Sequence, residues 1–257
     1  MNSTINSILL VVLVLYGAAC VFLFVMQRGF IYYPTPESSN PEARDLRINS
    51  AGETLQLWQL NPGQEQAIIY FGGNAEDVAG NIPMFAAIFP DFTFYLVNYR
   101  GYGASSGSPS EAGLFADAEA IYDQLAADHG RIDLIGRSLG SGVAVHLAAA
   151  REVGRLALVT PYDSIANVAS KAMPLFPVKW LLQDRFESWR IAPGLTTPTL
   201  ALLAEQDNVI PRASSESLVA AFKPEFIQFE IIPEADHNSI GMMVIYWDSL
   251  REFFSSP

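Results

Sequence analysis

The segment that decides the fold is Ile132-Asp133-Leu134-Ile135-Gly136-Arg137-Ser138-Leu139-Gly140. A short apolar run leads directly into a G-x-S-x-G motif, and an Ala-rich stretch follows up to residue 150. This order predicts a buried strand, a sharp turn and a helix packed closely on a sheet. A turn this tight requires glycine at positions 136 and 140 and exposes the Ser138 hydroxyl. The alternative is a plain strand–helix turn in which Ser138 caps the helix.

Similar apolar runs recur along the rest of the chain and alternate with amphipathic stretches. Strands are predicted at residues 55–60, 67–71, 92–97, 132–135, 156–159, 199–204 and 226–232, and helices after the Ser-Pro-Ser-Glu of 108–111, at 138–150 and at 242–254. We interpret 108–111 as a capping box with Pro109 at the first helical position. The alternation predicts an α/β fold with a mainly parallel central sheet and helices on both faces. Residues 28–49, with three prolines, are predicted to form a connector.

A serine hydroxyl needs a base to become a nucleophile, and the chain has three histidines. His146 lies eight residues beyond Ser138 on the same predicted helix, about 12 Å along its axis, which is too far. His129 is predicted at a helix end. His237 lies in a polar loop after the last predicted strand, where α/β proteins bind ligands, and is the predicted general base.

The histidine in turn needs a carboxylate to orient its ring. Asp207 follows the strand predicted at 199–204 and gives the chain order Ser138, Asp207, His237. The competing carboxylates are Asp163, one strand earlier, and Asp236, adjacent to the histidine. We favour Asp207 because Asp236 would have to turn back onto its neighbour's ring.

A tetrahedral intermediate needs two N–H donors. The predicted donors are the main-chain amides of Leu139, which follows Ser138, and of Asn74, in the Gly72-Gly73-Asn74-Ala75 loop. The alternative for that loop is a plain glycine turn.

Residues 8–26 read ILLVVLVLYGAACVFLFVM and carry no charge. A helix of this length is about 28 Å long, which matches the hydrocarbon core of a bilayer, so a transmembrane anchor is predicted. A cleaved signal peptide is disfavoured because no Lys or Arg precedes the run. Arg28, Arg44 and Arg47 follow it, which favours a single-pass protein with a cytoplasmic C-terminal domain.

Composition narrows the class of protein further. The chain has 257 residues, 50% of them hydrophobic, which excludes a disordered chain. Its net charge of -12 disfavours a nucleic-acid partner. Cys20, the only cysteine, cannot form an internal disulfide. Nothing in the sequence indicates a particular oligomeric state.

The motifs at 71–75, 98–103, 108–111 and 136–142, with the Asp207 and His237 loops, resemble those of the alpha/beta-hydrolase superfamily. More narrowly, the chain resembles membrane-anchored serine hydrolases related to eukaryotic protein depalmitoylases and their bacterial relatives. It departs from that group at Gly72, where a histidine is usual, and at Asn98, where an aspartate is usual. The resemblance implies an anchor at residues 1–27 and a hydrolase domain at 28–257, with a short lid at 161–193.

This resemblance and the motifs together predict a serine hydrolase that cleaves esters or thioesters, without a metal or organic cofactor. Small-molecule or lipid acyl substrates, and acylated proteins, are the expected partners. Within the lid, Phe176 and Trp180 are predicted to line an acyl pocket or to touch the bilayer. The alternatives are a serine peptidase or amidase with the same residues, and a silent membrane-tethered interaction module.

Overall fold

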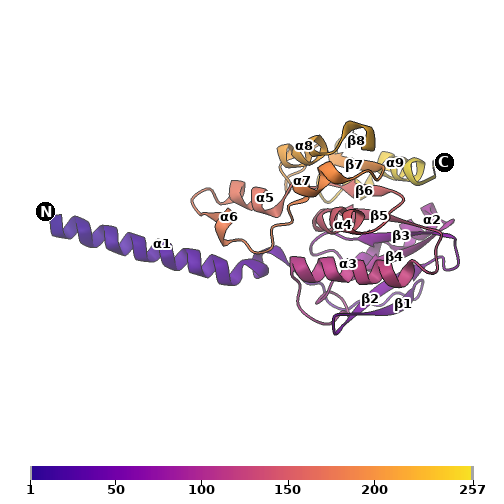
Figure 1. The fold of residues 1–257 in the computed structure, drawn as a ribbon, viewed down its shortest axis with the longest axis horizontal. Coiled ribbons are helices and arrows are strands. Elements are labelled where there is room, and N and C mark those ends of the chain that lie inside the picture. Colours follow the sequence, from indigo (N-terminus) through magenta and orange to yellow (C-terminus); the bar gives the residue numbers. More distant parts are fainter. Residues whose placement is uncertain (1, 256–257) are drawn as a thin grey trace.

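The computed structural model describes residues 2–255, and a sheet of eight strands forms its centre (Figure 1). The strand order is β1-β2-β4-β3-β5-β6-β7-β8. Strand β1 pairs antiparallel with β2, β2 pairs antiparallel with β4, and all the other neighbours are parallel. The strands are β1 (Arg44–Ser50), β2 (Glu53–Leu60), β3 (Gln66–Phe71), β4 (Phe92–Val97), β5 (Arg131–Arg137), β6 (Leu156–Val159), β7 (Thr199–Ala204) and β8 (Ile227–Ile232).

The predicted parallel sheet is therefore confirmed, but the predicted connector at 28–49 is wrong. It contains the end of a helix and the edge strand β1. An edge strand pairs on one side only and leaves much of its length in water. In β1 the exposed positions include Arg44, Asp45 and Arg47. Because these residues are charged, the strand has no apolar run by which it could be predicted.

Helices cover both faces of the sheet and bury two separate hydrophobic cores. On one face lie α3 (Glu111–Leu125), α4 (Leu139–Ala150) and α8 (Arg212–Ala221). On the other face lie α2 (Ile82–Ile88) and α9 (Val244–Ser255). Short 3-10 helices occur at Val78–Asn81, Ala192–Gly194, Pro224–Phe226 and Ile240–Met242.

The start of α3 differs from the predicted capping box. Ser110 is the N-cap, and its hydroxyl accepts a hydrogen bond from the Gly113 amide at 3.1 Å. Pro109 therefore lies before the helix. The Glu111 carboxylate turns away from the helix and accepts the main-chain N–H groups of Arg185 and Phe186 at 2.7 and 2.9 Å. Glu111 thus bonds to a segment 75 residues away in the chain instead of to the start of its own helix.

Helix α1 (Asn2–Ile31) projects from the domain (Figure 1). Its part from Thr4 to Ile31 is long and apolar enough to cross a membrane, and its most apolar 18-residue window is not buried against the domain. The helix includes the predicted span, residues 8–26, and continues beyond it to Ile31.

Between β6 and β7 the chain forms α5 (Ile165–Ala172), α6 (Val178–Leu181) and α7 (Ser188–Ile191). Helices α5 and α6 extend from the domain toward α1 (Figure 1). These helices fall within residues 161–193, where a lid is expected, and we refer to this segment as the lid.

Candidate active site

Ser138 lies in the turn between β5 and α4, with φ 48° and ψ −114°. The two glycines of the motif permit this turn. A Cβ at Gly136 would lie 2.5 Å from the Gly140 carbonyl oxygen, and one at Gly140 would lie 2.0 Å from the Phe71 carbonyl oxygen. Those contacts are far inside van der Waals distance, so the prediction that side chains at both positions would clash is confirmed.

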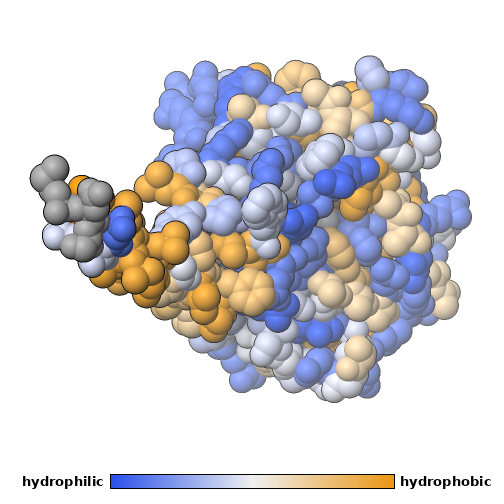
Figure 2. All heavy atoms as spheres, turned by 60° about the vertical axis from the view of Figure 1, so that its left-hand side comes forward, coloured by the Kyte–Doolittle hydropathy of each residue, from blue (hydrophilic) through white to orange (hydrophobic). Residues whose placement is uncertain are grey.

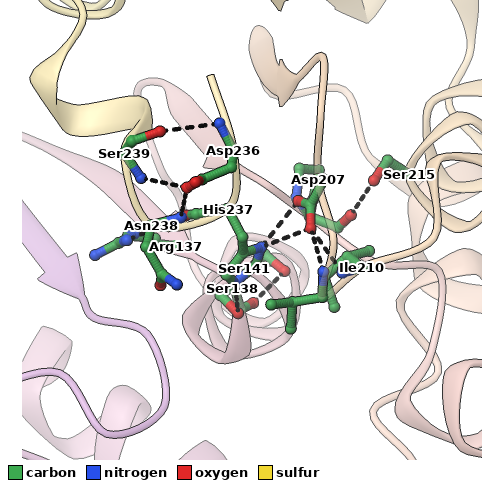
Figure 3. A network of polar contacts seen from close by, with 12 residues as sticks. Arg137, Ser138, Ser141, Asp207, Ile210, Ser215, Asp236, His237, Asn238 and Ser239 are labelled. Carbon is green, nitrogen blue, oxygen red and sulfur yellow. Dashed lines mark hydrogen bonds and ion pairs between the residues drawn. The ribbon is translucent and has the colours of Figure 1, made fainter. Parts of the chain in front are cut away.

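The structure brings Ser138, His237 and Asp207 together at the carboxyl edge of the sheet (Figure 3). The His237 Nε2 atom lies 2.9 Å from the Ser138 Oγ atom. On the other side of the ring, Nδ1 lies 2.8 Å from Asp207 Oδ2 and 3.1 Å from Oδ1. A neutral imidazole with its proton on Nδ1 donates to the carboxylate and accepts the serine proton at Nε2. The three residues follow β5, β7 and β8, where parallel strands end at the same edge.

The Asp207 carboxylate is well held. Its Oδ1 atom accepts the main-chain N–H groups of Val209 and Ile210 at 2.9 and 2.8 Å, and its side chain is only 5% exposed. Burial raises the pKa of Asp207, but the bonds from His237, Ile210 and Val209 outweigh burial and hold the pKa below its ordinary value. Asp207 is therefore ionised at neutral pH and attracts positive charge on the His237 ring.

The competing residues are occupied elsewhere. Asp163 bonds to Ser214 and to Asn167 Nδ2, and Asp236 accepts the amides of Asn238 and Ser239 in its own loop (Figure 3). The two remaining histidines also have other partners. His146 bonds to Glu119 and stacks on Phe115, and His129 bonds to Tyr95 and to the Gln64 carbonyl oxygen.

The predicted oxyanion donors lie beside the serine. Asn74 and Leu139 line the same cavity as Ser138. Leu139 is the first residue of α4, so its N–H has no partner within the helix. Within residues 2–255 no acceptor is found for the Asn74 main-chain N–H, while its side chain bonds to the Tyr102 hydroxyl and the Ile31 carbonyl oxygen. The side chain thereby fixes the loop and leaves the amide available.

Sequence reasoning missed the ion pair that supports this loop. Glu76 accepts the Gly73 N–H at 2.5 Å and pairs with Arg137 at 3.2 Å. Arg137 also donates to the His237 carbonyl oxygen at 3.3 Å. The pair therefore joins the loop after β3, the serine turn and the histidine loop. Arg137 occupies a variable position of the G-x-S-x-G motif, so the motif itself gives no signal for this role.

Gly72 and Asn98, where the chain departs from the resembled group, are both held by hydrogen bonds. At Gly72 the carbonyl oxygen accepts the Tyr99 hydroxyl at 2.7 Å, which holds the loop without a histidine. Asn98 is 2% exposed and donates to Gln56 Oε1 at 2.8 Å. A neutral amide therefore replaces the usual carboxylate and is paired with a second amide.

A cavity of about 290 Å³ opens above Ser138, and its walls are mostly apolar. The lid contributes Ile165, Val168, Ala169, Met173, Val178, Leu181 and Leu182, and helix α1 contributes Leu23, Gln27, Phe30 and Ile31. Tyr162, whose hydroxyl donates to the Leu139 carbonyl oxygen, is a further wall residue.

Phe176 and Trp180 do not line this cavity, so their assignment to the acyl pocket is corrected. Both line a separate hollow of the lid instead, where Trp180 is 88% exposed and Phe176 is half-buried and stacks on Tyr16 of α1. The apolar periodicity of a short lid helix does not show which of its faces turns toward the serine. The other half of that expectation, contact with the bilayer, is compatible with the exposure of Trp180.

A model of the alpha/beta hydrolase family matches residues 75–196. An uncharacterized protein of Mycobacterium tuberculosis is 31% identical over 262 residues, covering 95% of this chain and 93% of the relative. The chain belongs to the alpha/beta hydrolase family. Alpha/beta hydrolase domain-containing protein 17C of Xenopus tropicalis is 30% identical to this alpha/beta hydrolase, covering 77% of the chain and 64% of the relative.

Solved structures agree on the fold. Esterase Pf2001 of Pyrococcus furiosus superimposes with a TM-score of 0.70 at 16% identity, covering 87% of this alpha/beta hydrolase and 97% of the esterase. An enol-lactonase of Burkholderia xenovorans superimposes with a TM-score of 0.65. At this identity the likeness supports the fold alone, and the chemistry of this chain is argued from its own residues.

Proposed function

We propose that this alpha/beta hydrolase cleaves carboxylic esters or thioesters through an acyl-enzyme on Ser138. The observation that carries the proposal is the continuous hydrogen-bonded chain from Ser138 through His237 to the buried Asp207 carboxylate. The apolar cavity above the serine fits an acyl group.

In the first half of the reaction the Ser138 oxygen attacks the acyl carbon and His237 Nε2 takes the hydroxyl proton. The amides of Leu139 and Asn74 bind the developing oxyanion. His237 then returns the proton to the leaving alcohol or thiol, whose bond to the acyl carbon breaks. In the second half His237 takes a proton from water, the hydroxide attacks the acyl-enzyme, and Ser138 regains its proton as the carboxylic acid leaves.

The proposal includes a membrane location. Helix α1 serves as a single-pass anchor that holds the domain at the bilayer surface. Arg28, Arg44 and Arg47 support a cytoplasmic position for the domain, by the positive-inside rule. A substrate carried in or near the membrane, either a lipid or an acylated protein, would then be concentrated at the site.

A panel of p-nitrophenyl esters of rising chain length, run beside a palmitoyl thioester, tests the reaction class. We expect hydrolysis that falls by at least about 10⁴-fold in Ser138→Ala. The matched control is Ser141→Ala, one turn further along α4, whose hydroxyl donates to the Ser138 carbonyl oxygen. No hydrolysis of any ester or thioester by the folded wild type would contradict the proposal and favour the silent interaction module.

A further inference from the structure

Helix α1 contacts the lid near the middle of its apolar run and again just after the run ends. Near the middle of the run, Tyr16 donates to the Leu175 carbonyl oxygen at 2.9 Å and stacks on Phe176 with ring centroids 5.7 Å apart. Just after the run, Gln27 donates to the Leu181 carbonyl oxygen at 3.2 Å and accepts the Gln183 N–H at 2.6 Å. The lid therefore lies against the half of α1 that adjoins the domain.

An ion pair and a hydrogen bond strengthen this contact where α1 enters the domain. Arg28, Tyr32 and Asp184 form them, and we call these three residues the clasp. Arg28 pairs with Asp184 at 3.0 Å, and the same carboxylate accepts the Tyr32 hydroxyl at 3.1 Å. Asp184 is 4% exposed, whereas the Arg28 side chain is 51% exposed. Exposed Arg28 and Tyr33 mark the level expected for lipid headgroups, since Arg and Tyr are enriched at that depth.

These contacts fix the depth of the lid relative to α1. From Tyr16 to Gln27 the helix rises about 16 Å, which is the hydrocarbon thickness of one leaflet. The apolar part of α1 beyond the lid, residues 8–15, is only about 12 Å long and cannot cross a core of about 30 Å. If α1 spans the bilayer, the lid tip, which we define as residues 173–182, must therefore lie inside the leaflet.

The lid tip has the properties that a lipid environment requires. Its only charge is Lys179, whose long stem can carry the ammonium group toward the headgroups. Leu175 and Trp180 are apolar and are 81% and 88% exposed. Figure 2 shows the apolar surface of α1 continuing onto the adjoining part of the domain.

The main chain of the lid tip is also largely satisfied from within, as hydrocarbon demands. Two of its residues are prolines, which have no N–H to leave unpaired. Most of its other main-chain N–H groups donate to nearby main-chain carbonyl oxygens. The donors are the N–H groups of Met173, Phe176, Val178, Trp180, Leu181 and Leu182. The exposed Leu175 carbonyl oxygen is covered by the Tyr16 hydroxyl.

The cavity at Ser138 extends along α1 toward the lid tip. Its α1 wall runs from Ile31, near the serine, to Leu23, about 12 Å further toward the membrane. Met173 and Leu181 form the facing wall, so the membrane helix itself is one side of the substrate site.

We infer that the lid tip enters one leaflet beside α1 and that a long acyl chain passes from that leaflet into the cavity between them, with its carbonyl end at Ser138. The acyl chain is that of a bilayer lipid, because the cavity extends down α1 from the headgroup level into the leaflet. The substrate part of this inference rests on the proposed function, whereas the depth of the lid does not.

The depth is tested with the full chain in phosphatidylcholine vesicles whose acyl chains are brominated near their middle. Bromine quenches tryptophan fluorescence at contact, and Trp180 is the tryptophan of the lid tip. We expect quenching that is largely lost in Trp180→Phe and retained in Trp189→Phe. Trp189 is 39% exposed and lies outside the lid tip. Equal quenching in wild type and Trp180→Phe would overturn the insertion of the lid.

The acyl path is tested by narrowing the cavity from the α1 side. Leu23→Trp should lower the ratio of kcat/KM for a hexadecanoyl ester to that for an acetyl ester about tenfold, because the indole occupies the far end of the cavity. Leu13→Trp, on the lipid-exposed part of α1, should leave the ratio unchanged. An unchanged ratio in Leu23→Trp would contradict the path.

Phosphatidylcholine and a palmitoylated peptide, offered in the same vesicles, distinguish a lipid from an acylated protein as the source of the acyl chain. Cleavage of the lipid supports the inference, and cleavage of the peptide alone contradicts the choice of source. If no ester is hydrolysed at all, the proposed function fails, while the bromolipid result still decides where the lid lies.

Discussion

The two ends of the cavity are held in place by different forces. At the polar end, Ser138, His237 and Asp207 sit on loops that leave a rigid parallel sheet, and main-chain geometry fixes each of them. At the apolar end, α1 meets the lid through side-chain contacts between segments about 150 residues apart in the chain. The polar end is therefore expected to tolerate little change, whereas the apolar end can open and close at modest cost.

The largest expected effect is at the polar end. Asp207→Asn keeps the shape of the side chain but removes the charge that favours an Nδ1 proton on His237. We expect kcat for a p-nitrophenyl ester to fall about 10³- to 10⁴-fold. Asp163→Asn, the control at the competing carboxylate, should change kcat less than tenfold. Comparable losses in both variants would remove the distinction between the two aspartates.

Gly140→Ala tests the rigidity of the same end through stability. The added Cβ would meet the Phe71 carbonyl oxygen at 2.0 Å, and main chain on both sides prevents relaxation. We expect the free energy of unfolding to fall by about 3 kcal/mol or more in urea titrations. Gly80→Ala, where the Cβ meets nothing within 4 Å, should change it by less than about 0.5 kcal/mol.

A weaker effect is expected at the apolar end. Asp184→Asn removes the carboxylate charge that pairs with Arg28 and leaves the clasp with hydrogen bonds to an uncharged amide. We expect amide hydrogen exchange in α5 and α6 to accelerate about tenfold, since a buried charged bond contributes about 1–3 kcal/mol. Asp248→Asn breaks the exposed pair with Arg251 and should leave that exchange unchanged. Unaltered exchange in Asp184→Asn would mean that the clasp does not hold the lid.

The smallest effect concerns Glu111, which joins α3 to the returning end of the lid. Burial raises the pKa of Glu111, and the amide bonds from Arg185 and Phe186 only partly offset this. A raised pKa means that the folded protein holds the Glu111 proton more tightly than the unfolded chain does. The tighter binding of this proton stabilises the folded protein at low pH. That part of the free energy of unfolding is lost as pH rises from the pKa of Glu111 in the unfolded chain through its higher pKa in the folded protein. In urea titrations from pH 4 to 7, Glu111→Gln should show a shallower decline than wild type, and an equal decline would contradict this.

The same contrast explains what the sequence could predict. Ser138, Asp207 and His237 were predictable because each follows a recognisable apolar strand, and parallel strands end at one edge. Strand β1 was missed because its charges face water at the sheet edge. Phe176 and Trp180 were wrongly assigned to the acyl pocket. Trp180 lies in a four-residue helix, which has too little periodicity to show its inner face, and Phe176 lies just before that helix.

The role of α1 as a cavity wall was equally invisible. An apolar run reports that a helix can enter lipid, but not that Leu23 and Ile31 turn toward a pocket formed more than 100 residues later. The Glu76–Arg137 pair could not be predicted either, because no sequence spacing relates the two loops that it joins.

The central claim is that Ser138 is a nucleophile activated by His237 at the head of an acyl-shaped cavity. The most direct test is the labelling of the full chain in vesicles by a long-chain alkyl fluorophosphonate, with the modified residue located by mass spectrometry. The account predicts a single adduct on Ser138 whose rate of formation falls at least about 10³-fold in His237→Ala. Absence of an adduct on Ser138 in the folded protein, or the same rate without His237, would contradict it.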